Sequence, residues 1–204
     1  MTETPPPAPR PKMSPVLRVV IVIAGIVAIV GGIMKMKQGF GEMSGKDPEI
    51  TRLSEESDKA IDEANKHGLE AAPLFQSMLD AVDKDGLDAA RAGKKDAAEK
   101  ARDLFARAAE QFRLAAQKLD EAAARKPNER LVAFFAAKSR GYKGYADARS
   151  INHDIARMFL DPSIKTIGEL EPKVLEAAKR RKDIEEAAAA AAAEAEKIAA
   201  ELKK

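Results

Sequence analysis

The 204-residue chain contains no cysteine and no tryptophan, and aromatic residues make up only 4% of it. The absence of cysteine excludes a disulfide-stabilised scaffold. Alanine, by contrast, accounts for 40 residues. Because alanine is the best intrinsic helix former and contributes little apolar area, the composition predicts long, closely packed helices rather than a deep globular core, and it excludes an all-β fold.

The chain also lacks a strong excess of one charge, since its formal net charge is +2. The first 45 residues hold five basic and two acidic residues, which leaves 30 basic and 31 acidic residues in the rest of the chain. A nucleic-acid-binding protein needs a net basic face that neutralises phosphates. We therefore expect no nucleic-acid partner, and we assign the basic excess to the flanks of one apolar segment.

That segment runs from Val16 to Met34 and is apolar except for Arg18. At about 1.5 Å per residue it spans roughly 28 Å, close to the thickness of a bilayer core, with Arg18 reaching the headgroups. It predicts a transmembrane anchor over residues 16–36. A cleaved signal peptide is the alternative, but the run is longer than an ordinary signal core and no small-x-small cleavage pattern follows it.

Small residues recur every fourth position within the anchor, at Ala24, Ala28 and Gly32, a spacing that allows two transmembrane helices to pack closely. Basic residues flank the anchor almost equally on both sides. Because a short basic tail usually stays in the cytoplasm, we expect the N-terminus there, the body exported, and the protein in a bacterial inner membrane. Proline-rich residues 1–15 predict a disordered tail, and residues 37–46 form a glycine-containing linker.

The remaining chain, residues 47–204, shows apolar or small residues at alternating intervals of three and four, typical of helices packed lengthwise. The clearest such seam alternates large residues with alanine, at Ala98, Ala101, Phe105, Ala108, Phe112, Ala115, Leu119 and Ala122. Capping and turn residues place four helices at about 47–85, 87–126, 128–160 and 166–203.

Short connections make neighbouring helices antiparallel, so the sequence predicts an all-α body, an elongated up-down-up-down four-helix bundle with coiled-coil-like packing. The alternative is an extended pair of helical hairpins in which the alanine-rich last helix is partly detached. We also expect a kink or brief break between Gly68 and Pro73. The helix at 128–160 carries most of the aromatic residues and is expected to be the best buried.

Four residues of that third helix, Gly141, Tyr142, Gly144 and Tyr145, form the candidate site. Glycines permit close approach of a neighbouring backbone, and tyrosines offer a polar group on an apolar ring. We interpret the set as a ligand-binding or helix-contact site. Arg181 falls on the seam of the last helix, so it must either be paired in the bundle or mark a solvated, open region.

No sequence pattern points to catalysis or to a cofactor. The two histidines, His67 and His153, lack the accompanying ligands that a metal site requires. No nucleophile motif, phosphate loop or dinucleotide fingerprint occurs. We therefore expect no enzymatic activity, no cofactor and no metal.

Together these features predict a single-pass membrane protein that acts by protein–protein interaction, as a tether, scaffold or accessory subunit of an envelope complex. The expected partners are the lipid bilayer and a protein, which includes a second copy of the chain. The alternative is a membrane-anchored sensory bundle that binds a small ligand between its helices.

Overall fold

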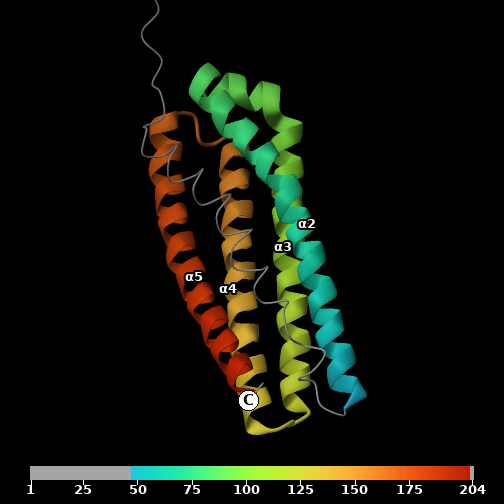
Figure 1. Cartoon of the computed structure of the whole chain (residues 1–204). Helices are drawn as coiled ribbons and strands as arrows, with labels where there is room; N and C mark the ends of the chain where they lie inside the picture. The colour runs from blue at the N-terminus through green and yellow to red at the C-terminus, as the bar shows by residue number, and fades with distance from the viewer. Residues whose placement is uncertain (1–46, 203–204) are drawn as a thin grey trace, which may run out of the picture.

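The computed structural model describes residues 47–202, and all of the regular structure there is helical. The four helices are α2 (Pro48–Asp85), α3 (Leu87–Ala124), α4 (Glu129–Leu160) and α5 (Ile167–Leu202), which run alternately up and down (Figure 1). This confirms the all-α, up-down prediction, and the helix ends differ from the expected ones by at most two residues.

The expected tail, anchor and linker, together with the packing residues Ala24, Ala28 and Gly32, lie outside the described residues. Among the helices of residues 47–202, none combines the length and the apolar character needed to cross a bilayer.

The helices pack in sequence order. Extensive contacts join α2 to α3, α3 to α4, and α4 to α5, so that α2 and α5 occupy the two edges of the row (Figure 1). Buried residues on α5 run from Ile167 to Ala195. The last helix is therefore docked along α4 rather than detached.

Local sequence signals explain where the helices begin. The side chains of Asp47 and Asn128 each accept a hydrogen bond of 2.9 Å from a backbone N–H in the first turn of the following helix. At the start of α5, the backbone N–H of Glu169 donates to the hydroxyl of Thr166, which precedes the helix, at 3.2 Å. Gly86, with a φ of 82°, is the single residue between α2 and α3, where a side chain would strain the backbone.

The predicted seam of α3 forms the centre of the core. Each of its eight residues is at most 3% exposed. Because the seam is narrow, the flanking helices come close enough for side chains to reach the α3 backbone. Ser57 of α2 donates to the carbonyl of Ala115 at 3.1 Å, and Ser139 of α4 donates to the carbonyl of Ala116 at 3.3 Å.

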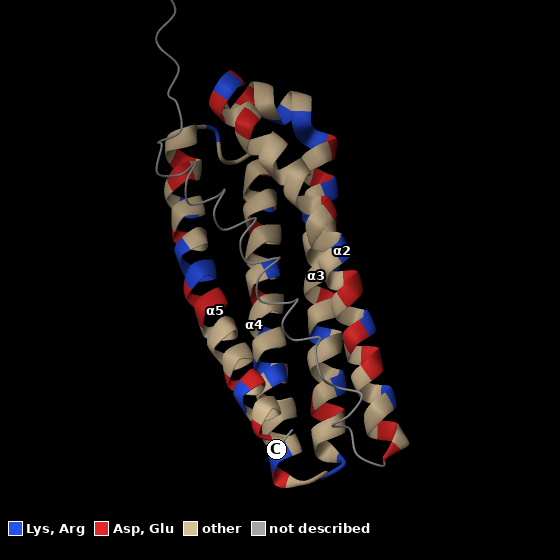
Figure 2. Ribbon diagram, viewed as in Figure 1, with Lys and Arg blue, Asp and Glu red and all other residues tan. Residues whose placement is uncertain are grey.

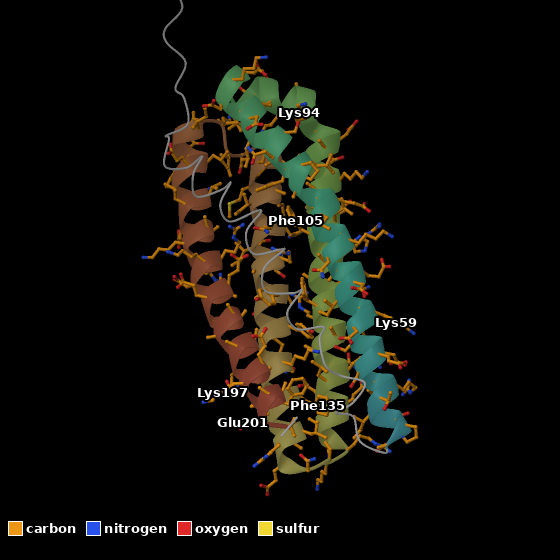
Figure 3. The ribbon with its side chains drawn as sticks, in the orientation of Figure 1. Lys59, Lys94, Phe105, Phe135, Lys197 and Glu201 are labelled. Carbon is orange, nitrogen blue, oxygen red and sulfur yellow. The ribbon has the colours of Figure 1, made fainter. Side chains whose placement is uncertain are left out.

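Larger side chains, among them Phe75 and Phe105, pack into the same core. Phe75 and Phe105 meet edge to face with their ring centroids 5.5 Å apart. Phe105 and Phe135 lie among the helices, whereas Lys59 and Lys197 extend from the two outer sides (Figure 3).

Of the expected kink or brief break in α2, the break does not occur, since the helix is continuous through Gly68 and Pro73. Pro73 is exposed, and water can satisfy the carbonyl group that loses its helical partner there. The non-helical residue lies instead in α3, at Lys94, with φ −127° and ψ 15°.

Arg91, one turn before Lys94, joins α3 to the C-terminal end of α4 and to the connection that leads to α5. Its guanidinium donates to three backbone carbonyls, those of Phe159 at 2.6 Å, Asp161 at 2.8 Å and Ile164 at 2.6 Å. The last carbonyls of a helix have no helical partner and carry partial negative charge. Arg91 therefore caps α4 and fixes the connection to α5 at the same time.

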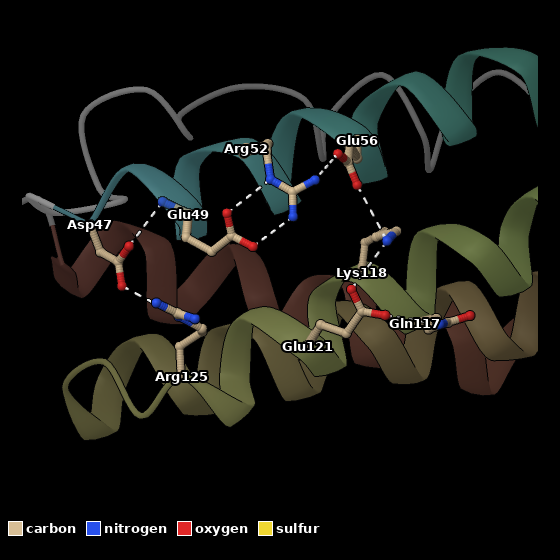
Figure 4. A network of polar contacts seen from close by, with 8 residues as sticks. All are labelled: Asp47, Glu49, Arg52, Glu56, Gln117, Lys118, Glu121 and Arg125. Carbon is tan, nitrogen blue, oxygen red and sulfur yellow. Dashed lines mark hydrogen bonds and ion pairs between the residues drawn. The ribbon is translucent and has the colours of Figure 1, made fainter.

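A polar network fixes the opposite end of the α2–α3 pair (Figure 4). Lys118 contacts Glu56 at 3.3 Å and Glu121 at 3.1 Å, and Arg125 contacts Asp47 at 3.6 Å. These side chains are partly solvated, so each pair contributes little to stability. Elsewhere along the described helices, acidic and basic residues are interleaved (Figure 2).

We predict that Arg91→Met lowers the free energy of unfolding by about 2–4 kcal/mol, because it leaves three carbonyl groups without a charged donor. Urea unfolding of the full-length chain, followed by circular dichroism, measures the change. The matched control is Arg107→Met, an exposed arginine on the same helix, which should change stability by less than about 0.5 kcal/mol. Equal effects of the two substitutions would contradict the role assigned to Arg91.

Candidate functional site between α4 and α5

The four residues singled out in the sequence divide between two sides of α4. Gly141 and Gly144 face α5, and Gly144 is so close that an added Cβ would lie 2.8 Å from the Cβ of Ala188. Tyr142 and Tyr145 are buried and pack near the ring of Phe112 on α3, with centroid separations of 6.4 and 5.7 Å. The glycines thus lie at the helix contact, and whether the tyrosines contact a ligand stays a prediction.

Beside this contact, α4 and α5 bury two arginines around one carboxylate. Arg149 of α4 and Arg181 of α5 are each 2% exposed. Arg149 Nη1 lies 3.8 Å from Glu185 Oε1, and Arg181 Nε lies 3.8 Å from Glu185 Oε2. Arg181 Nη1 also donates to Asn152 Oδ1 at 2.8 Å. Arg181 is therefore buried and paired within the bundle and does not mark a solvated, open region.

Burial dominates the electrostatics of this charged cluster, which consists of Arg149, Asn152, Arg181 and Glu185. Desolvation lowers the pKa of Arg149, lowers the pKa of Arg181 to about 10 and raises the pKa of Glu185. In each case the attraction of the opposite charge is smaller than the cost of burial. Burial also raises the pKa of Tyr145. Glu185 adds to that rise and Arg149 opposes it, so Tyr145 lies in the electrostatic field of the cluster.

The sequence contains a signal for this cluster, but a search for apolar residues alone does not detect it. Tyr145, Arg149 and Asn152 follow one another at intervals of four and three, the same spacing as the buried apolar residues. A charged residue at a seam position is therefore buried here. The contact of Arg149 with Glu185 joins separate helices, and the pattern of either helix alone does not contain it.

Lys138, further along the same stripe of α4, is a third buried cation. It is 1% exposed, and its Nζ lies 3.6 Å from Asp58 Oδ1 and 5.8 Å from the ring centroids of Phe134 and Tyr142. Desolvation lowers the pKa of Lys138 to about 8, although Asp58 favours the charged form. The lysine links α4 to α2 across the row of helices.

The histidines do not form part of any such cluster. His67 is half-buried on α2, and His153 lies 3.2 Å from Asp154 on α4. Within residues 47–202, no three or more histidine, cysteine, aspartate or glutamate side chains are placed to hold a metal ion.

No known protein family, curated protein or solved structure matches this chain. The interpretation of the charged cluster therefore depends on its own geometry. Guanidinium groups present several N–H donors in a plane and recognise carboxylate and phosphate oxygens. Two of them beside one glutamate form a set of residues suited to holding negative charge.

We predict that Gly144→Ala lowers the free energy of unfolding by about 1–3 kcal/mol, because α5 must move away from α4 to admit the new methyl group. Gly93→Ala on α3 is the matched control, since a Cβ there meets nothing within 4 Å, and it should stabilise the chain by up to about 1 kcal/mol. Urea unfolding measures both. Combining Gly144→Ala with Ala188→Gly should recover part of the loss, and no recovery would contradict the steric explanation.

The second prediction from this region is a rise in stability with pH that Lys138 causes. Above pH 8 the folded chain has begun to release this proton, whereas the unfolded chain retains it up to the ordinary lysine pKa of 10.5. The unfolded state then binds more protons, so stability increases between pH 8 and 9.5, by at most about 1.4 kcal/mol per pH unit. Urea unfolding at several pH values should show the rise in the wild type and lose it in Lys138→Met.

Lys143→Met provides the control for that measurement, because Lys143 is exposed on the same helix and paired with Asp120 at 2.8 Å. It should keep the pH dependence of the wild type. If the rise in stability with pH remains in Lys138→Met, or is lost in both variants, a group other than Lys138 is responsible.

Proposed function

We propose that this protein is a non-enzymatic, membrane-anchored interaction protein. In this proposal the apolar run at residues 16–34 holds the chain in a bacterial inner membrane, with the N-terminus in the cytoplasm and the helical body exported. The body binds a protein partner, or a second copy of the chain, as a tether, scaffold or accessory subunit of an envelope complex.

One observation of the body carries this proposal, namely the one-sided packing of α5. Among the helices that the structure describes, α5 makes its extensive contact with α4 alone. On its outward side, exposed small residues recur at Ala189, Ala193 and Ala200, with Glu196 between them. Such spacing allows the backbone of another helix to approach, as it does at the contact between α4 and α5.

The distribution of charge supports a protein rather than a nucleic acid as the partner. Acidic and basic residues are interleaved along the described helices in the view of Figure 2. Interleaved charges favour a particular register between two helices, because like charges that meet in other registers are unfavourable.

Site-specific photo-crosslinking in membranes tests the proposal. A photoreactive residue at Ala193 should crosslink to a protein, either a partner or a second copy, because this position faces outward from the edge helix. The same residue at Ala133, which is exposed on the inner helix α4, should give a much lower yield. No protein adduct at Ala193, or equal yields at both positions, would exclude α5 as the binding edge.

The same membranes provide an independent control for the anchor. Washing with alkaline carbonate should leave the full-length chain in the membrane fraction and release a version that lacks residues 1–36. Release of the full-length chain would remove the membrane part of the proposal and leave the interaction part open to the crosslinking result.

A further inference from the structure

The charged cluster between α4 and α5 contains more positive than negative charge. Arg149 and Arg181 are almost fully buried, and Glu185 is the acidic side chain in contact with both. Both ion pairs measure 3.8 Å, whereas charge-assisted hydrogen bonds are about 2.7–2.9 Å long. Glu185 is thus shared between two cations without a close hydrogen bond to either.

Several donors of the cluster have no hydrogen-bond acceptor among residues 47–202. These are Arg149 Nη1 and the Nε and Nη2 atoms of Arg181, and Glu185 Oε1 likewise has no donor. Buried guanidinium N–H groups normally find acceptors, because leaving them unpaired costs free energy. Here donors from two helices converge on one place, and Asn152 fixes the orientation of Arg181 through Nη1.

We propose that Arg149 and Arg181 bind a small oxyanion between α4 and α5. Its oxygens accept hydrogen bonds from the unpaired guanidinium nitrogens, and its charge neutralises the excess cation. Glu185, which is 13% exposed, is the competing anion that lies nearest to solvent. The ligand displaces it from the two arginines.

The surroundings limit the size of the ligand. The contact between Gly144 and Ala188 lies next to the cluster along both helices, since Tyr145 follows Gly144 and Glu185 is one turn before Ala188. Because the helices are in contact there, the proposed ligand is a small oxyanion such as phosphate, sulfate or a single carboxylate group rather than a nucleotide. Oxyanion binding at this site does not depend on the proposed interaction function. It gives a ligand class to the alternative prediction of a sensory bundle.

The chain contains intrinsic fluorophores close to this site. Its two tyrosines, Tyr142 and Tyr145, are both on α4, and it has no tryptophan. Tyr145 lies in the field of Arg149 and Glu185. Intrinsic tyrosine fluorescence therefore reports on the neighbourhood of the cluster without a label.

The test is a titration of the full-length chain in a non-ionic detergent with sodium sulfate, sodium phosphate and sodium acetate. Sodium chloride at the same ionic strength is the reference. We expect a saturable change in tyrosine fluorescence and a rise of a few degrees in the thermal unfolding midpoint with at least one oxyanion, and neither effect with chloride. A response to acetate alone identifies a carboxylate ligand, and a response to sulfate and phosphate identifies a tetrahedral one. Identical responses to all four salts would overturn the proposal.

Variants separate binding from a purely structural role. Glu185→Gln keeps both arginines and removes the competing charge, so it should shift the titration to lower oxyanion concentration, by roughly tenfold. Arg181→Met should abolish the response. Arg140→Met is the matched control, because it removes a half-exposed arginine that pairs with Glu194 at 2.7 Å across the same two helices, and it should respond like the wild type.

These outcomes remain decisive if Arg181→Met fails to fold, because Glu185→Gln alone distinguishes the two roles. If the cluster has only a structural role, Glu185→Gln destabilises the chain and produces no response to oxyanions. Failure here leaves the crosslinking at Ala193 unaffected, so the two proposals can fail separately.

Discussion

Close approach of helix backbones is the constraint on which this structure depends. Alanine along α3 leaves so little side chain between neighbours that serine hydroxyls on α2 and α4 reach its backbone carbonyls, and glycine on α4 allows a similarly close contact with α5. Van der Waals contact over long helices then replaces the large apolar side chains that the chain lacks. The same constraint makes a single added methyl group at Gly144 a steric problem.

A thin seam also explains why charged side chains are buried. Lys138, Arg149 and Arg181 occupy positions that leucine or phenylalanine would take in a thicker core, and their long apolar stems fill the space between helices. Each then needs a partner at its charged end. Asp58 of α2 and Glu185 of α5 supply these partners, so the polar contacts of the interior join α4 both to its neighbour α5 and, across the row, to α2.

Much of the fold could be predicted from local sequence signals, because caps and seams act within one helix. Asn128 and Thr166 mark helix starts through hydrogen bonds to residues within four positions. The course of α2 through Pro73 could not be predicted, because it depends on which face of the helix meets water. Of the charged cluster and its surroundings, the sequence pattern marks Tyr145 and Arg181 separately, whereas the pairing of Arg149 with Glu185 depends on how α5 is rotated against α4.

Arg91 has a consequence for the order in which the chain assembles. Most helix contacts here join elements that are neighbours in sequence, and such local topology favours rapid folding, one hairpin after another. Arg91 is different, because the carbonyls it binds are 68 to 73 residues further along the chain. These bonds form only after α3 and the end of α4 have met. Arg91 thus makes its bonds only when α3 and α4 are packed together, and it then fixes the connection from which α5 begins.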